Sequence, residues 1–207
     1  MQATGKPAKH AQRLPLARSA QGMGDEMRRW IALLAAAVAA TAFGLVSPAV
    51  AAPEPYCGIR WGSLPEIHDE MSSASLVNVR AGRHQCFDRL VLDLRGHADG
   101  YRVEYVATVR SDGSGQVVPL RGGAKLQIVA LAPAYDDSGN STYRPANRNE
   151  LVNVAGWSTF RQVASAGSFE GQTTLGLGVR ARLPFRVFTL DGPGTGSRIV
   201  IDVAHHW

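Results

Sequence analysis

Apolar and polar residues alternate along most of the chain after residue 75, and this two-residue period limits what the chain can fold into. The clearest example is Arg89 to Arg95, where Leu90, Leu92 and Leu94 face one way and the intervening residues face the other. Such alternation is typical of a strand with one buried face. No segment after residue 52 combines a 3.6-residue apolar period with helix caps. The pattern therefore predicts an all-β fold.

Glycine- and proline-containing turns divide this region into about eight or nine short strands. We expect the strands at residues 75–80, 89–95, 101–110, 116–120, 124–132, 160–166, 173–182, 185–190 and 198–204. Short strands joined in this way favour a sandwich or a closed barrel. We predict a single β-sandwich that follows an N-terminal signal helix.

A polar stretch from Pro133 to Glu150 interrupts the strand pattern. It is rich in turn formers such as Asp136, Gly139 and Pro145. A loop of this length in a compact domain is usually functional or disordered.

The N-terminal part has the layout of a secretory signal peptide. The uncharged run Trp30–Val46 follows Arg28 and Arg29, and Ala49-Val50-Ala51 provides small residues for cleavage, which would leave Ala52 as the mature start. The alternative is a retained membrane anchor, but the apolar run is at the short limit of the length that spans a bilayer. We divide the chain into 1–22, a disordered or mis-annotated extension, 23–51, the signal peptide, and 52–207, the folded domain.

The positive charge of the chain resides mostly in this leader. Residues 1–51 carry a net charge of +4 and residues 52–207 a net charge of only +1. A nearly neutral domain argues against a nucleic-acid partner, and it has no polybasic run for an anionic membrane. We therefore expect no nucleic-acid binding and no stable membrane insertion after signal cleavage.

Both cysteines, Cys57 and Cys86, lie in the exported part. A pair of cysteines in an oxidising compartment is most simply a disulfide. Zinc binding is less suitable, because two isolated thiols lack the paired C-x-x-C spacing.

A short pattern occurs twice in the chain. The segments Arg89–Leu94 (RLVLDL) and Arg198–Val203 (RIVIDV) each place Arg and Asp four residues apart on one outer face of a strand. Two explanations stay open: internal pseudo-symmetry, or the ordinary patterning of half-buried strands.

These strands and several neighbouring segments resemble the AMIN-like domain of exported actinobacterial proteins. The resemblance covers most of residues 57–207. It rests on the segments Cys57–Gly62 (CGIRWG), Val79–His84 (VRAGRH), Cys86–Arg89 (CFDR) and Gly167–Thr173 (GSFEGQT). It implies a β-sandwich and a place in the cell envelope, because related AMIN domains accompany cell-wall amidases and secretin-type pores as modules that bind peptidoglycan. It carries over no catalytic residue. Many members carry a lipid-anchored cysteine after the leader, and this chain lacks one.

Catalytic and metal-binding patterns are weak in this sequence. There is no G-x-S-x-G motif around a serine. Asp136, Asp137 and Glu170 are carboxylates of the kind that glycosidases use in pairs, but nothing shows that they face one another. His205 and His206 are adjacent and would point to opposite faces of a strand. We expect no catalytic residue, no metal site and no cofactor.

The strand 173–182 presents one candidate binding surface. Its outer face carries Gly176 and Gly178, followed by Arg180 and Arg182. Two glycines in line leave room for a ligand or for another side chain, and arginines suit carboxylate or phosphate groups.

Aromatic residues of the loops form the second candidate. Tyr135, Tyr143 and Trp157 are suited to stacking on sugar rings, or to covering the open ends of the sandwich. Trp157 is also a candidate to fill the space above the two glycines.

From these features we predict a non-catalytic, secreted, envelope-associated module that recognises peptidoglycan or another wall polymer. The alternative is an interaction domain that docks on an envelope protein, and a hydrolase built from the loop carboxylates is the least supported reading. The expected partner is thus a cell-wall glycan or an envelope protein.

Overall fold

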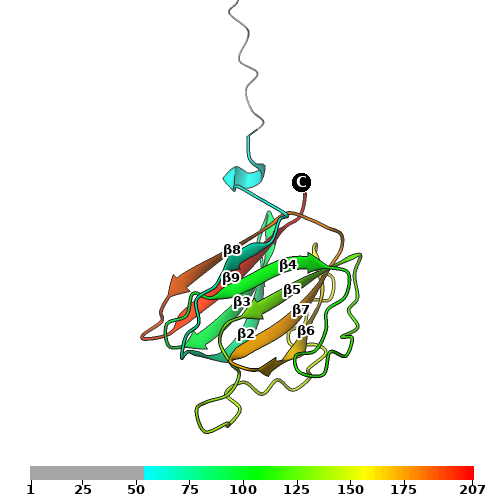
Figure 1. Cartoon of the computed structure of the whole chain (residues 1–207). Helices are drawn as coiled ribbons and strands as arrows, with labels where there is room; N and C mark the ends of the chain where they lie inside the picture. The colour runs from blue at the N-terminus through cyan, green and yellow to red at the C-terminus, as the bar shows by residue number, and fades with distance from the viewer. Residues whose placement is uncertain (1–53) are drawn as a thin grey trace, which may run out of the picture. The chain divides into compact units, whose positions relative to one another are not determined.

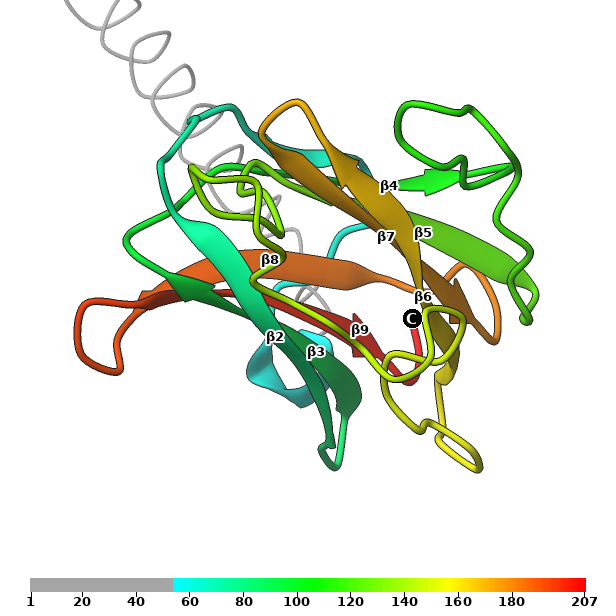
Figure 2. The same cartoon turned by 90° about the horizontal axis from the view of Figure 1, so that it is seen from below.

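Two antiparallel sheets pack face to face in the computed structural model, which describes residues 54–207 (Figure 1; seen from below in Figure 2). One sheet has the strand order β1-β4-β5-β7-β6 and the other has the order β2-β3-β9-β8. The strands are β1 (Glu66–His68), β2 (Ser75–Arg83), β3 (Phe87–Arg95), β4 (Tyr101–Val106), β5 (Ala124–Ala130), β6 (Phe160–Phe169), β7 (Gln172–Val179), β8 (Phe185–Asp191) and β9 (Ser197–Ala204). This confirms the predicted all-β sandwich. The expected signal helix and the segment 1–22 lie outside the described residues.

The structure corrects three of the predicted strands. Residues 116–120 form no strand and make only the single bridge between Arg110 and Val117. Pro119 cannot donate to a sheet ladder, and the segment lies instead across a face of β7. The strand expected at 101–110 ends at Val106, and the one expected at 173–182 ends at Val179. The short edge strand β1 was not predicted, because its three residues are too few to show alternation.

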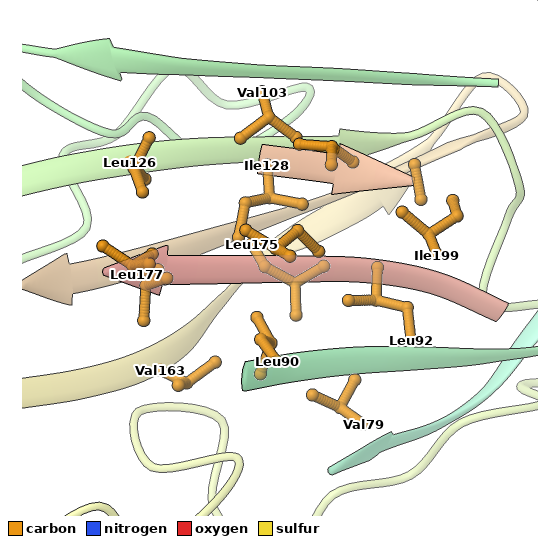
Figure 3. Packing of buried hydrophobic residues seen from close by; sticks show 14 of the residues in the cluster. Val79, Leu90, Leu92, Val103, Leu126, Ile128, Val163, Leu175, Leu177 and Ile199 are labelled. Carbon is orange, nitrogen blue, oxygen red and sulfur yellow. The ribbon is translucent and has the colours of Figure 1, made fainter. Parts of the chain in front are cut away.

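Aliphatic side chains from both sheets fill the space between them (Figure 3). In β3, Leu90, Leu92 and Leu94 are buried together, as the alternation predicts. Fully buried partners come from the facing sheet: Val103, Leu126, Ile128, Val163, Leu175 and Leu177. This shared apolar layer is the main source of stability, since burial of each such side chain contributes about 1.5–3 kcal/mol.

The two copies of the repeated pattern lie side by side in the centre of one sheet. β3 and β9 pair antiparallel, so Arg89 is opposite Asp202 and Asp93 is opposite Arg198. The hairpins β2–β3 and β8–β9 therefore meet along β3 and β9, and β2 and β8 lie at the edges of the sheet. Each arginine is thus in register with the aspartate of the other copy. Arg89 forms an ion pair with Asp202, whereas Arg198 donates to the Asp191 carbonyl, so the two copies differ in their contacts.

A buried carboxylate connects the two sheets. Asp88 of β3 accepts hydrogen bonds from the backbone N–H groups of Thr159 and Phe160 at 2.7 and 3.0 Å. Its other oxygen lies 3.2 Å from Nε2 of His205. Asp88 is fully buried, so these three contacts replace its lost water. They join β3, the start of β6 and the C-terminal segment.

The segment before β1 is attached to the sandwich covalently. Cys57 lies in the 3-10 turn η1 (Tyr56–Gly58) and forms the predicted disulfide with Cys86, just before β3. A backbone bridge between Gly62 and Phe185 adds a second attachment. Between residues 54 and 207, no helix has the length and apolar character needed to cross a membrane.

Candidate functional site

The long connection between β5 and β6 is bound to the strands beside it. The Leu76 N–H donates to the Pro133 carbonyl at 2.8 Å, and the Thr142 hydroxyl donates to the Leu76 carbonyl at 2.7 Å. Further along, the Ser165 N–H donates to the Arg148 carbonyl at 2.7 Å. The loop is thus held against β2 on one side and β6 on the other.

A cavity of about 440 Å³ lies beneath this loop. The core residues Leu76 and Leu175 lie at its apolar side. The loop contributes Tyr135, Ser141, Tyr143, Arg144, Pro145 and Arg148, and β6 and β7 contribute Ser165, Gly167, Ser168 and Thr173. The volume falls within the range of small-molecule sites, which are apolar with a few polar groups.

Two of the three predicted loop aromatics meet in this cavity. Tyr135 is half-buried, and its hydroxyl accepts a hydrogen bond from the Gly171 N–H at 2.9 Å. Tyr143 packs against the core, and burial raises the pKa of its phenol. Between residues 54 and 207, the hydrogen bond to Tyr143 goes to its backbone carbonyl, which accepts from the Ser141 hydroxyl at 2.9 Å.

The charged side chains that line the cavity are all positive. Arg144 and Arg148 are exposed at its rim, and no acidic residue lines it. Arginine binds carboxylate and phosphate groups through two parallel N–H donors. The cavity therefore favours an anionic ligand that also presents a surface for the two tyrosine rings.

Asp136 stays outside this arrangement and stabilises its own turn. Its carboxylate accepts from the Asn140 N–H at 2.8 Å and from the Ser138 N–H at 3.0 Å. The bond from Asn140 is the main reason why its pKa lies below the usual value. A glycosidase acid needs a raised pKa, so Asp136 is poorly suited to proton donation.

The face of β7 with the two glycines is covered. A Cβ on Gly176 would lie 2.6 Å from the Leu120 side chain, and a Cβ on Gly178 would overlap the Arg121 carbonyl oxygen. The segment that packs here is the one that forms no strand. The space left by the two glycines is therefore filled by another part of the chain. Leu120 fills it, and not Trp157.

Arg180 and Arg182 hold neighbouring backbone. The Arg180 guanidinium donates to the carbonyls of Ser158 and His205 at 3.2 and 2.7 Å. The Arg182 guanidinium donates to the Ser63 carbonyl at 3.0 Å and lies 4.7 Å from the Tyr105 ring centroid. Neither lines the loop cavity, so the structure separates them from Tyr135 and Tyr143.

Trp157 also lies away from the loop cavity. Its ring stacks on Phe160 with centroids 5.9 Å apart and planes inclined by 12°, and the Arg83 guanidinium lies 5.9 Å from its centroid. Trp157 thus covers an edge of the core.

The adjacent histidines have separate roles. His205 contacts Asp88, whereas His206 meets the Tyr56 ring edge to face with centroids 5.7 Å apart. Within residues 54–207, no group of three His, Cys, Asp or Glu side chains is placed to hold a metal ion.

Arg144, Arg148 and Ser168 line the cavity but were not among the predicted site residues. Both arginines lie in the stretch 133–150, which is expected to be functional or disordered, and their proximity to Tyr143 is the available signal. The position of Ser168 in the cavity could not be predicted from the sequence, because it depends on the pairing of β6 with β7. The Ser168 hydroxyl accepts a hydrogen bond from the Ala134 N–H of the loop at 2.8 Å.

Comparison with known proteins gives one match. The model of the AMIN-like domain matches residues 74–205, a narrower span than the resemblance seen in the sequence. No curated protein and no solved structure matches the chain significantly. The match includes the whole loop cavity and leaves out η1, β1 and Trp207.

Proposed function

Because the chain belongs to the AMIN-like domain family, whose members are generally non-catalytic modules associated with the cell envelope, we propose that it binds a cell-wall glycan, with peptidoglycan as the expected polymer. The binding site is the loop cavity. The observation that carries the proposal is the convergence of Tyr135, Tyr143, Arg144 and Arg148 on one hollow without an acidic residue.

The chemistry of the cavity matches a wall polymer. Aromatic faces pack against the apolar face of a sugar ring. Arginines bind the carboxylates of peptidoglycan peptides or the phosphates of other wall polymers. Non-catalytic binding is consistent with the lining, because glycoside hydrolysis requires two carboxyl groups across the sugar and none lines this cavity.

Family membership and the Cys57–Cys86 disulfide indicate an extracytoplasmic protein. We propose in addition that residues 23–51 are removed during export, which releases a chain that starts at Ala52. N-terminal sequencing of the exported protein tests this. A product that keeps Trp30–Val46 would instead be an anchored protein.

Sedimentation of the exported protein with purified cell walls tests glycan binding. Arg144→Ala together with Arg148→Ala is expected to weaken binding about tenfold or more, because each charge-assisted hydrogen bond contributes about 1.5–3 kcal/mol. Both side chains are exposed, so the double variant should fold. The matched control is Arg102→Ala with Arg110→Ala, which removes the same charge from exposed positions outside the cavity.

Two outcomes of this experiment would contradict different parts of the proposal, namely the position of the binding site and the identity of the ligand. Binding that survives loss of Arg144 and Arg148 would place the ligand elsewhere on the domain. A wild-type protein that leaves the walls unbound while an envelope protein co-purifies with it would contradict glycan binding and support the docking alternative.

A further inference from the structure

A second hollow lies at the other end of the sandwich from the loop cavity. Figure 1 shows η1 and the C-terminus together at one end and the yellow-green loop that follows β5 at the other. Tyr56, Trp61 and Trp207 line this hollow of about 630 Å³. It shares no lining residue with the loop cavity, so it is a separate feature of the surface.

The two indole rings of this hollow are fixed in orientation. The Trp61 Nε1–H donates to the Tyr56 carbonyl at 2.9 Å, and the Trp207 Nε1–H donates to the Arg182 carbonyl at 3.0 Å. Because both indole N–H groups are used, the rings offer their apolar surfaces to the hollow. Trp207 remains 71% exposed, which is unusual for so large an apolar side chain.

Several contacts support this arrangement from behind. The Arg186 guanidinium lies 5.5 Å from the Trp61 ring centroid and is itself paired with Asp202. The Cys57–Cys86 disulfide holds the turn that carries Tyr56. The aromatic surfaces are therefore preorganised, which lowers the entropic cost of binding a ligand.

The remaining lining defines the chemistry of the ligand. Ile59 and Pro184 add apolar surface to the hollow, and the exposed residues Glu54 and Arg60 add charges of opposite sign. A pyranose ring has the same two-sided character, with C–H groups on its faces and hydroxyls around its edge. We infer that this terminal aromatic hollow is a second carbohydrate-binding site, which takes a pyranose ring against Trp61 and Trp207.

The size of the hollow favours a sugar over a protein partner. Among residues 54–207, eight residues line it, whereas a stable protein interface uses about 20–30 residues on each side. Seven of these eight residues lie outside the span 74–205 that matches the AMIN-like domain, Pro184 being the exception. The hollow is thus built on the family domain from its flanking segments, and the inference does not rest on the function proposed for the loop cavity.

Titration of the ¹⁵N-labelled exported protein with the β-1,4-linked tetramer of N-acetylglucosamine tests this inference. The indole N–H signals of Trp61 and Trp207 are expected to shift saturably, while that of Trp157 stays in place as an internal control. Sorbitol, which has hydroxyls but no ring, serves as the control solute and should leave all three signals unmoved.

Variants make the test specific to the hollow. Trp207→Ala removes an exposed terminal side chain and should weaken tetramer binding about tenfold, with Trp207→Phe retaining part of it. The Arg102→Ala, Arg110→Ala double variant, which is changed at exposed positions outside both hollows, should bind the tetramer as the wild type does. Signals of Trp61 and Trp207 that stay unmoved by the tetramer, or that move equally with sorbitol, would overturn the inference.

Discussion

Arg89 and Asp202 form a bidentate ion pair across the two central strands β3 and β9, with Nε–Oδ1 and Nη2–Oδ2 distances of 2.6 and 2.8 Å. Asp202 lies on the outer face of its sheet and is nevertheless fully buried. Arg186 of β8 also contacts it, at 2.7 Å, and the rings of Phe87 and Phe188 pack against the guanidinium groups. One carboxylate therefore holds two arginines in a largely dehydrated cluster, and its hydrogen bond raises the pKa of Arg89.

Replacement of this carboxylate should destabilise the domain. Asp202→Asn removes the charge that pairs with Arg89 and Arg186, and we expect a loss of about 2–3 kcal/mol in the free energy of unfolding. The equivalent aspartate of the other copy is the matched control. Asp93 pairs with Arg80, whose side chain is 51% exposed, so Asp93→Asn should cost less than about 1 kcal/mol. Urea denaturation of both variants measures the difference, and equal losses would contradict the distinction.

The disulfide should contribute substantially to stability. Cys57 and Cys86 are separated by 29 residues, and the chain-entropy treatment of such a loop gives roughly 3.5 kcal/mol. The Cys57→Ser, Cys86→Ser variant should therefore lose about 2–4 kcal/mol in chemical denaturation. Wild-type protein in the presence of a reductant serves as the comparison, because both should unfold at the same denaturant concentration. A loss under about 1 kcal/mol would mean that the other attachments of this segment hold it alone.

The covered glycine face predicts a strong positional effect. A Cβ at Gly178 overlaps the backbone of Arg121, so Gly178→Ala must displace a main-chain segment and should cost about 3 kcal/mol or more. Gly62 has open space around its Cβ position, and Gly62→Ala should change stability by less than about 0.5 kcal/mol. Thermal unfolding of the two variants checks the prediction, and a Gly178→Ala domain with unchanged stability would show that residues 117–121 do not pack on β7.

Tyr105 should stabilise the turn before β8 through its hydroxyl. That hydroxyl donates to the Leu183 carbonyl at 2.6 Å and accepts from the Leu183 N–H at 3.0 Å. Tyr105→Phe leaves both backbone groups without this partner and should cost about 1–3 kcal/mol. Chemical denaturation at neutral pH measures the loss, with Tyr56→Phe as a control at a tyrosine outside this turn.

The same residue predicts a dependence on alkaline pH. Burial raises the pKa of Tyr105 from 10.0 to about 12. Because the pKa is higher in the folded state, the contribution of the protonated phenol is complete below pH 10.0 and is lost as pH rises to about 12. Absorbance titration of the tyrosines should show a late step that Tyr105→Phe removes. A titration curve unchanged by Tyr105→Phe would refute the assignment.

Strand patterning and cysteine usage were readable without a structure. The alternation through Leu90, Leu92 and Leu94 directly reports which side chains enter the core, because a strand turns successive residues to opposite faces. Two cysteines can pair with each other in one way only. The loop with Tyr135 and Tyr143 was likewise recognisable from its turn formers, and both residues line the cavity.

The site itself depended on contacts between distant segments. The cavity is lined by Tyr143 from a loop, Ser168 from β6 and Leu76 from β2. No local sequence pattern predicts that these three residues lie close together. The terminal hollow shows the same dependence, since Trp61 and Trp207 lie at the two ends of the domain sequence and meet only through the disulfide, the β8 contacts and the C-terminal backbone.

The sequence by itself determined that the chain makes an all-β, disulfide-bonded domain, because side-chain period and residue chemistry are local properties. Whether the glycine face of β7 is open was decided by the tertiary structure alone. A glycine in the sequence indicates only that a side chain is absent, and the space it leaves is equally suited to a ligand or to another part of the chain. Here Leu120 and Arg121 occupy that space, and the accessible aromatic and arginine groups lie at the two ends of the sandwich instead.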